Sequence, residues 1–123
     1  MKNVGEVMST ELLSIDPSTT VAEAATMMGS RKVGAALVTV DGRLVGIFTE
    51  RDIVKALAAH FDAAGHPVEQ WMTKEPSSIG SDQSENDALD MMLASGFRHL
   101  PVVDGGDLKG IVSIRDVSHH AKT

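Results

Sequence analysis

The sequence predicts an α/β fold of the α+β type, built from two copies of one β-α-β-β-α unit. The segment 46–52, Gly-Ile-Phe-Thr-Glu-Arg-Asp, returns 64 residues later at 110–116 as Gly-Ile-Val-Ser-Ile-Arg-Asp. Sliding the whole chain over itself by the same 64 residues gives a match without gaps, which indicates a doubled unit. Within each copy, helical periodicity alternates with short apolar runs, which is typical of a small sheet covered by helices.

Length and composition set the limits of this prediction. The 123 residues allow one compact domain or two half-domains that share a core, and 42% of them are apolar. A net charge of −6 disfavours nucleic-acid binding, which normally needs a basic face. The absence of cysteine excludes disulfides, thiol catalysis and cysteine-based metal sites. No apolar run approaches membrane-spanning length, so we expect a cytoplasmic protein without membrane contact.

The first copy is predicted to open with a helical turn at residues 4–8 and an extended piece at 13–15. Apolar residues at i, i+3, i+4 and i+7 then predict a helix, which Gly34 ends. The apolar face of this helix consists of Val21, Ala24, Ala25 and Met28, and the candidate caps are Ser18, Thr19 and Thr20.

A β-hairpin and a second helix complete the first copy. Two apolar runs, 35–40 and 44–48, flank the dipeptide Asp41-Gly42, which favours a two-residue hairpin turn. Thr49 then opens a helix. The apolar stripe predicted for it consists of Val54, Leu57, Ala58 and Phe61.

The second copy repeats this order. It has an extended piece at 77–79, a helix marked by Leu89 and Met92, and a hairpin around Gly105-Gly106. The last helix follows Ser113. The predicted boundaries are 1–62 for the first repeat, 63–67 for the linker and 68–123 for the second repeat.

The repeated Gly-Ile segment lies where a strand ends and a helix begins, a place that suits nucleotide chemistry. The unpaired N–H groups of a helix N-terminus attract a phosphate. Gly46 lacks a Cβ, so a flat ligand can approach the strand closely. The hydroxyl of Thr49 can donate to a phosphate or ribose oxygen, and the carboxylate of Asp52 can accept both hydrogens of a vicinal diol. The second copy has the same set at Gly110, Ser113 and Asp116.

A structural interpretation of the same residues stays open. Ser/Thr-x-x-Asp resembles the capping box, in which the hydroxyl and the acid satisfy backbone donors of the first helical turn. Finding the glycine, the hydroxyl and the acid in both copies favours binding, although a duplicated cap would give the same pattern.

The chain resembles a tandem pair of cystathionine β-synthase-type (CBS) domains, in particular small stand-alone bacterial CBS-pair proteins. The resemblance rests on the two Gly-Ile segments, on residues 68–73 and on residues 98–104, Arg-His-Leu-Pro-Val-Val-Asp. It implies two repeats related by a pseudo-two-fold axis, packed through their sheets, with two clefts for adenine nucleotides. It also implies a homodimer that acts as a regulatory sensor without chemistry of its own.

The resemblance also implies ligand-binding roles for individual residues. Asp52 and Asp116 would hold ribose hydroxyls, and Thr49 and Ser113 would contact ribose or phosphate. Ser14, Ile15, Ser78 and Ile79 would face the adenine, Arg98 and His99 would face phosphates, and Ile47, Pro101 and Ile111 complete the expected ligand-binding set.

The two expected clefts are unequal. Arg98-His99 aligns with Gly34-Ala35, so the cation of the second copy is missing from the first, where Arg31 or Lys32 can replace it. The ligand is AMP, ADP or ATP, or a larger adenosine compound such as NAD or S-adenosylmethionine, with no further cofactor.

Two rival functions remain. One is an interaction protein in which the clefts are degenerate and the motifs serve as caps. The other is an enzyme, which is disfavoured because no constellation of nucleophile, base and orienting group is evident. No metal site is expected: we interpret His119-His120 as a solvated helix end. The regulated protein target is unknown.

Overall fold

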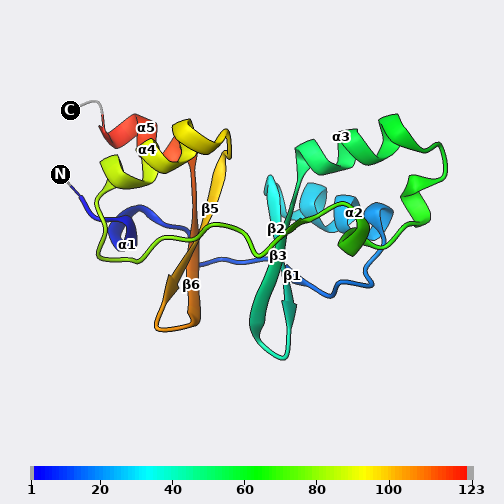
Figure 1. Ribbon diagram of the computed structural model, residues 1–123, viewed down its shortest axis with the longest axis horizontal. Helices are drawn as coiled ribbons and strands as arrows, with labels where there is room; N and C mark the ends of the chain where they lie inside the picture. The colour runs from blue at the N-terminus through cyan, green and yellow to red at the C-terminus, as the bar shows by residue number, and fades with distance from the viewer. Residues whose placement is uncertain (1, 122–123) are drawn as a thin grey trace. The chain divides into compact units, whose positions relative to one another are not determined.

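The computed structural model describes residues 2–121, and the side chains of residues 2–117. The chain forms two compact units, each with one β-hairpin and its helices (Figure 1). We call Leu13–Pro76 the central unit, and Met1–Leu12 together with Ser77–Thr123 the terminal unit. No helix of the described residues is both long and apolar enough to cross a membrane.

The central unit contains a four-stranded sheet in the order β1-β2-β3-β4. Strand β1 (Ser14–Ile15) runs parallel to β2 (Ala35–Val40), which forms a hairpin with β3 (Arg43–Thr49). The hairpin turns at Asp41-Gly42 as predicted, and both residues have positive φ angles of 52° and 78°, as a type I′ turn requires. The sequence did not predict β4 (Thr73–Lys74), which pairs antiparallel with β3.

Helices α2 (Val21–Arg31) and α3 (Glu50–Ala59) cover one face of this sheet, followed by the short 3-10 helices η1 (Ala63–Gly65) and η2 (Val68–Gln70). Side chains alternate between the two faces of a strand. The core cluster beneath the helices includes Ile15, Val38, Phe48, Val21, Ala24, Met28 and Ala56.

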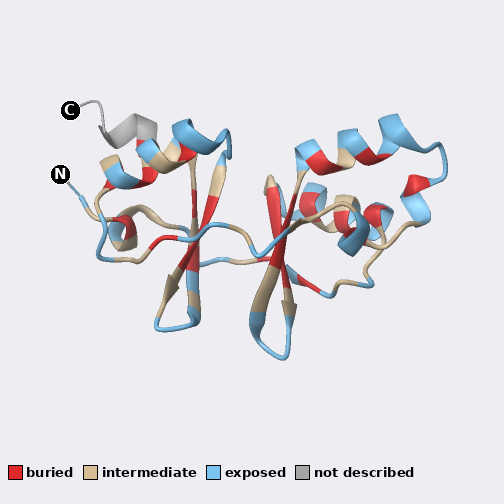
Figure 2. Ribbon diagram, in the orientation of Figure 1, coloured by how far each residue is buried: buried red, intermediate tan, exposed pale blue. Residues whose placement is uncertain are grey.

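The prediction for the apolar stripe of α3 was wrong about which side of the helix is buried. Val54, Leu57 and Phe61 are 67%, 49% and 98% exposed, and Figure 2 shows the outer side of α3 in the exposed colour. The buried residues of α3 are Asp52 and Ala56. Helical spacing identified a stripe of larger apolar residues, but the small side chain of Ala56 lets the other side of the helix approach the sheet.

The terminal unit has a two-stranded hairpin of β5 (His99–Asp104) and β6 (Asp107–Ser113). Three helices accompany it: α1 (Val4–Val7), α4 (Glu85–Ser95) and α5 (Ile114–Ala121). The extended piece predicted at 77–79 makes one isolated parallel bridge, Ile79 to Val102, and no longer strand. A mixed α/β fold with two repeats is therefore confirmed.

The compact units exchange their opening segments relative to the sequence repeats. In the terminal unit, the N–H of Val4 donates to the carbonyl of Gln83 at 2.8 Å. In the central unit, the N–H of Val68 donates to the carbonyl of Thr19 at 2.8 Å. These two bonds are equivalent under the 64-residue register, so each unit receives its opening segment from the other copy.

Candidate functional site

The strand-to-helix junction of the central unit joins Thr49 to Asp52. The Oδ2 atom of Asp52 accepts a hydrogen bond from the Thr49 N–H at 2.9 Å and another from the Thr49 hydroxyl at 3.2 Å. Asp52 is 7% exposed. Burial raises the pKa of Asp52 above its ordinary value, while the bonds from Thr49 and the charges of Lys55 and Arg51 act in the opposite direction.

The terminal unit has the same junction with a complete reciprocal cap. The Ser113 N–H donates to Asp116 Oδ2 at 3.3 Å, and the Asp116 N–H donates to Ser113 Oγ at 3.2 Å. The capping interpretation is therefore confirmed at both junctions, since Asp52 likewise accepts from the N–H of Thr49, the N-cap of α3. A carboxylate has two oxygens and about four acceptor positions. Because the caps use Oδ2 in both units, capping leaves capacity for a second partner.

The sheet of the central unit brings predicted site residues to the face opposite its helices. Cα partners on neighbouring strands point to the same face. Ser14 pairs with Leu37, and Leu37 pairs with Ile47. Thr49 ends the same strand two residues after Ile47, so Ser14, Ile47 and Thr49 share this face. Ile15, by contrast, belongs to the core beneath the helices.

The hairpin of the terminal unit gathers an equivalent set. His99 pairs with Ser113, and Pro101 pairs with Ile111, so these four residues share one face of the hairpin. Arg98 directly precedes them and is exposed. The structure thus brings together the predicted residues Arg98, His99, Pro101, Ile111, Ser113 and Asp116.

Ile79 lies among core residues. Its side chain is 5% exposed and packs in the core cluster of the terminal unit. Its N–H donates to the Pro101 carbonyl at 3.0 Å, and its carbonyl accepts from the Val103 N–H at 2.9 Å. The adjacent Ser78 is exposed and is the better placed residue of this extended piece for contact with a ligand.

The role predicted for the two motif glycines is corrected by the structure. The space beside Gly46 holds the Met72 side chain, and the space beside Gly110 holds Met8 and the Ser9 carbonyl. A Cβ on Gly110 would lie 2.7 Å from that carbonyl oxygen. The sequence showed that a side chain is excluded there, but it could not show that the exchanged segment, rather than a ligand, requires this.

The two junctions have an equivalent backbone hydrogen bond but different side chains. The Glu50 N–H donates to the Gly34 carbonyl at 3.2 Å, and the Ile114 N–H donates to the Arg98 carbonyl at 2.8 Å. A cationic side chain thus occupies this position in the terminal unit alone. Lys32, which was expected to replace it, is the left-handed C-cap of α2 with a φ angle of 58°.

No group of three metal-ligating side chains occurs within the part of the chain that the structure describes. The side chains of His119 and His120 lie outside that part.

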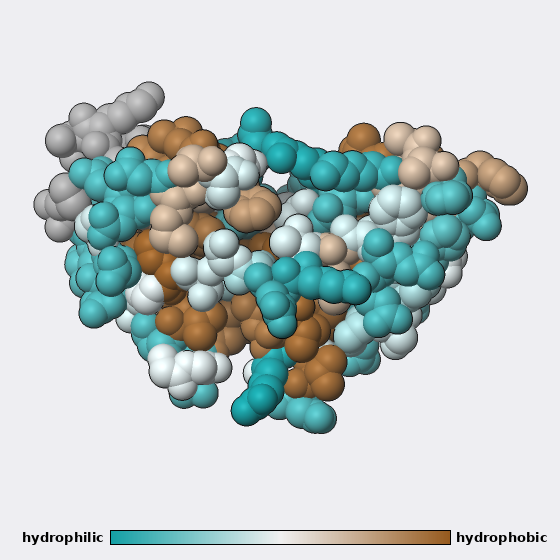
Figure 3. Space-filling model, viewed as in Figure 1, coloured by the Kyte–Doolittle hydropathy of each residue, from teal (hydrophilic) through white to brown (hydrophobic). Residues whose placement is uncertain are grey.

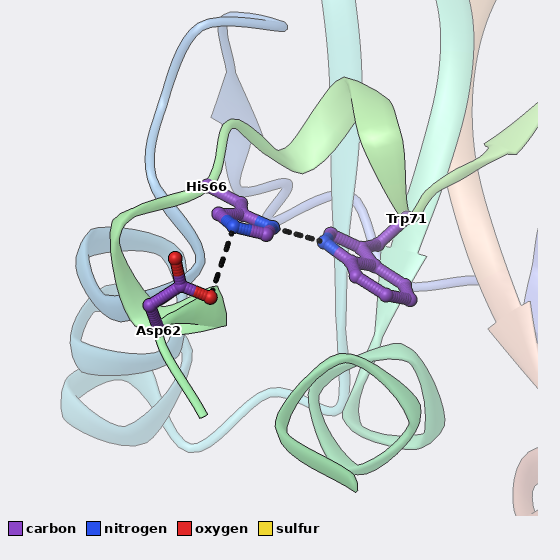
Figure 4. A network of polar contacts seen from close by, with 3 residues as sticks. All are labelled: Asp62, His66 and Trp71. Atoms are coloured by element: carbon purple, nitrogen blue, oxygen red, sulfur yellow. Dashed lines mark hydrogen bonds and ion pairs between the residues drawn. The ribbon is translucent and has the colours of Figure 1, made fainter. Parts of the chain in front are cut away.

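Sequence reasoning missed two features. Glu85 is 2% exposed, and its Oε2 atom has no hydrogen-bond partner. The available signal was the repeat itself, since Glu85 aligns with the apolar Val21. The second feature is a chain of polar contacts from Asp62 through His66 to Trp71 (Figure 4).

Comparison with known proteins agrees with the doubled architecture. The family model for the CBS domain matches residues 4–59 and 68–122. An uncharacterized 17.7 kDa protein of Acidianus ambivalens is 47% identical over 118 residues, covering 94% of this chain and 70% of that protein. The CBS-domain containing protein ATU1752 from Agrobacterium tumefaciens has a TM-score of 0.92 at 34% identity, with 98% of this chain and 99% of that chain covered.

Two similar structures contain adenosine compounds. CBSX2 of Arabidopsis thaliana, solved in complex with AMP, has a TM-score of 0.84 at 29% identity and covers 99% of this chain and 97% of its own. The CBS domain pair of MJ0100, solved with 5′-methylthioadenosine and S-adenosyl-L-methionine, has a TM-score of 0.90 at 25% identity and covers 99% of this chain and 97% of its own.

Proposed function

Because this chain belongs to the CBS domain family, we propose that it is a non-catalytic regulatory module of the cytoplasm that binds an adenosine compound. The observation that carries the proposal is the matched pair of strand-to-helix junctions. Each presents a hydroxyl and a carboxylate one helical turn apart, at Thr49 and Asp52 and at Ser113 and Asp116. Similar proteins support this ligand class: one was solved in complex with AMP, and another with 5′-methylthioadenosine and S-adenosyl-L-methionine.

The proposed ligand contacts follow from the chemistry of each residue. Asp52 and Asp116 accept hydrogen bonds from ribose hydroxyls through the carboxylate capacity that capping leaves. Ser14, Ile47, Ser78, Pro101 and Ile111 lie beside the base and sugar. Arg98 and His99 donate to phosphate, so a ligand with a phosphate prefers the junction of the terminal unit over that of the central unit.

Calorimetry with AMP, ATP and S-adenosylmethionine tests the proposal. Asp52→Asn and Asp116→Asn are suitable variants because an amide oxygen still accepts the capping bond. Loss of a hydrogen bond to a charged group costs about 1.5–3 kcal/mol, so the variant of the occupied junction should bind about 10–100-fold more weakly. Asp87→Asn, an exposed acid in the first turn of α4, is the matched control and should bind like the wild type.

A second candidate function is an interaction module whose junctions act only as caps. The observation in its favour is that both acids already accept bonds from their own capping residues. Equal binding of AMP, ATP and S-adenosylmethionine by the wild type and by the double Asp52→Asn, Asp116→Asn variant would reject our assignment of these acids. Mass spectrometry of small molecules that copurify with the protein, compared with the same double variant, is an independent check.

We further propose that two copies associate through the outer stripe of α3, by which we mean Val54 and Leu57 on the helix together with Phe61 just after its end. These residues are exposed apolar side chains, and Figure 3 shows hydrophobic surface over α3. A second copy of the chain, with the same stripe, is the proposed occupant.

A further inference from the structure

The residues after α3 form a polar contact chain that we call the linker clasp: Asp62, His66 and Trp71. The indole Nε1–H of Trp71 donates to Nδ1 of His66 at 3.4 Å. The Nε2 atom of His66 lies 3.4 Å from Oδ1 of Asp62. Figure 4 shows the imidazole between the carboxylate and the indole, with one ring nitrogen facing each.

These contacts assign the tautomer of the neutral His66 ring. An indole nitrogen can only donate, so Nδ1 of His66 must be the unprotonated, accepting nitrogen. The hydrogen of the neutral ring is then on Nε2, where it points at Asp62. A second proton would have to occupy Nδ1, which would bring two donors face to face.

A second imidazole lies beside the His66 ring. The imidazole of His60, at the end of α3, lies 5.6 Å from that of His66 and 5.9 Å from the Trp71 indole, measured between ring centroids.

The clasp holds a segment that builds the sheet. The His66 carbonyl accepts from the Val21 N–H at the start of α2, at 2.9 Å. Trp71 is followed by Met72, which fills the space beside Gly46, and by β4, where Thr73 pairs with Ile47. A change at Trp71 therefore acts on the segment that pairs with β3.

We propose that the linker clasp is a pH-responsive device in which protonation of His66 on Nδ1 breaks its bond to Trp71 and releases the indole. Histidine changes charge between about pH 5 and pH 8, so the device works in the physiological range. It stands on the geometry of the linker and does not depend on the proposed ligand.

Trp71 is the one tryptophan of the chain, so its indole N–H gives a single resonance in a ¹H–¹⁵N spectrum. In the wild type, this resonance should move in one transition between about pH 8 and pH 5. His66→Phe keeps a ring against the indole but cannot titrate, and should abolish the transition. His60→Phe is the matched control and should retain it.

An indole resonance insensitive to pH in the wild type would overturn the proposal. So would a transition that persists in His66→Phe, or one that disappears in His60→Phe.

Discussion

Glu85 begins α4 at the position where Val21 begins α2, and both residues are buried, at 2% and 1% exposure. One carboxyl oxygen of Glu85 accepts from the Lys2 N–H at 3.2 Å, and the other has no partner. A buried polar atom without a partner costs about 1–3 kcal/mol. The terminal unit therefore contains an acid where its counterpart contains a hydrocarbon.

Replacing Glu85 with an apolar side chain of similar length should stabilise the fold. We expect Glu85→Met to raise the free energy of unfolding by about 1 kcal/mol, because the gain at Oε2 exceeds the loss of the bond from Lys2. Urea denaturation measures this change. Asp87→Met, at an exposed acid of the same helical turn, is the control and should stay within about 0.5 kcal/mol of wild type. A clear loss of stability in Glu85→Met would show that the acid anchors residue 2.

Asp52 should make stability depend on pH in an unusual direction for an acid. Because burial raises its pKa on folding, the stability it contributes is full below the ordinary carboxyl value of about 3.9 and is lost as the pH rises through the raised value. The free energy of unfolding of wild type, relative to Asp52→Asn, should therefore fall as the pH rises above the ordinary carboxyl value of about 3.9. Denaturation at several pH values checks this, and a difference that rises with pH would contradict it.

Asp104 should show the opposite dependence. It accepts bonds from the hydroxyl and from the N–H of Ser81, the latter at 2.9 Å, and these bonds hold the pKa of Asp104 below its usual range. Its stabilising contribution is present above the ordinary value of about 3.9 and is lost as the pH falls through the lowered value. On acidification below about pH 4, wild type should lose more stability than Asp104→Asn. Equal slopes for the two proteins would reject the prediction.

Substitution by alanine should lower the free energy of unfolding by different amounts at the two motif glycines, Gly46 and Gly110. A Cβ on Gly110 meets the backbone carbonyl of Ser9, which cannot move freely, whereas a Cβ on Gly46 meets the flexible Met72 side chain. Overpacking costs about 1–3 kcal/mol, so we expect Gly110→Ala near the upper end of this range and Gly46→Ala near the lower end. Adding Met72→Ala should relieve the clash in Gly46→Ala, whereas adding Met8→Ala should leave most of the clash in Gly110→Ala. Double-mutant cycles of unfolding free energy measure both couplings.

The outer stripe of α3 should determine whether two copies of the chain associate. We expect Leu57→Glu to halve the mass measured by native mass spectrometry, because a charge would be buried between two copies. Val40→Glu is the control, since Val40 is an exposed apolar residue at 44% that lies on β2, outside the stripe. A dimer that persists in Leu57→Glu, or one that is lost in Val40→Glu, would place the interface elsewhere.

Local chemistry explains what the sequence predicted well. Asp41-Gly42 and Gly105-Gly106 form the expected hairpin turns because their positive φ angles are accessible to Gly and Asp at little cost. Ser113 and Asp116 form the expected cap within four residues of chain. In these places the relevant contacts lie close together in the sequence.

Long-range contacts explain the features that the sequence did not predict. The antiparallel bridge between Ser9 and Ile111 joins residues from opposite ends of the chain, and no local pattern in either segment identifies its partner. The same limit applies to the contact of Met72 with Gly46 and to the orientation of α3. Helical spacing identifies which residues share one face of a helix, but it does not identify what that face packs against. The ligand-binding roles of Asp52, Arg98 and His99 remain predictions.

Because the opening segments are exchanged, a fragment that contains one sequence repeat does not contain one complete compact unit. A chain cut in the linker would separate Val4 from Gln83 and Val68 from Thr19, so each fragment would carry a segment made for the other and lack its own. Neither fragment should fold by itself, but the two fragments mixed together should restore both units.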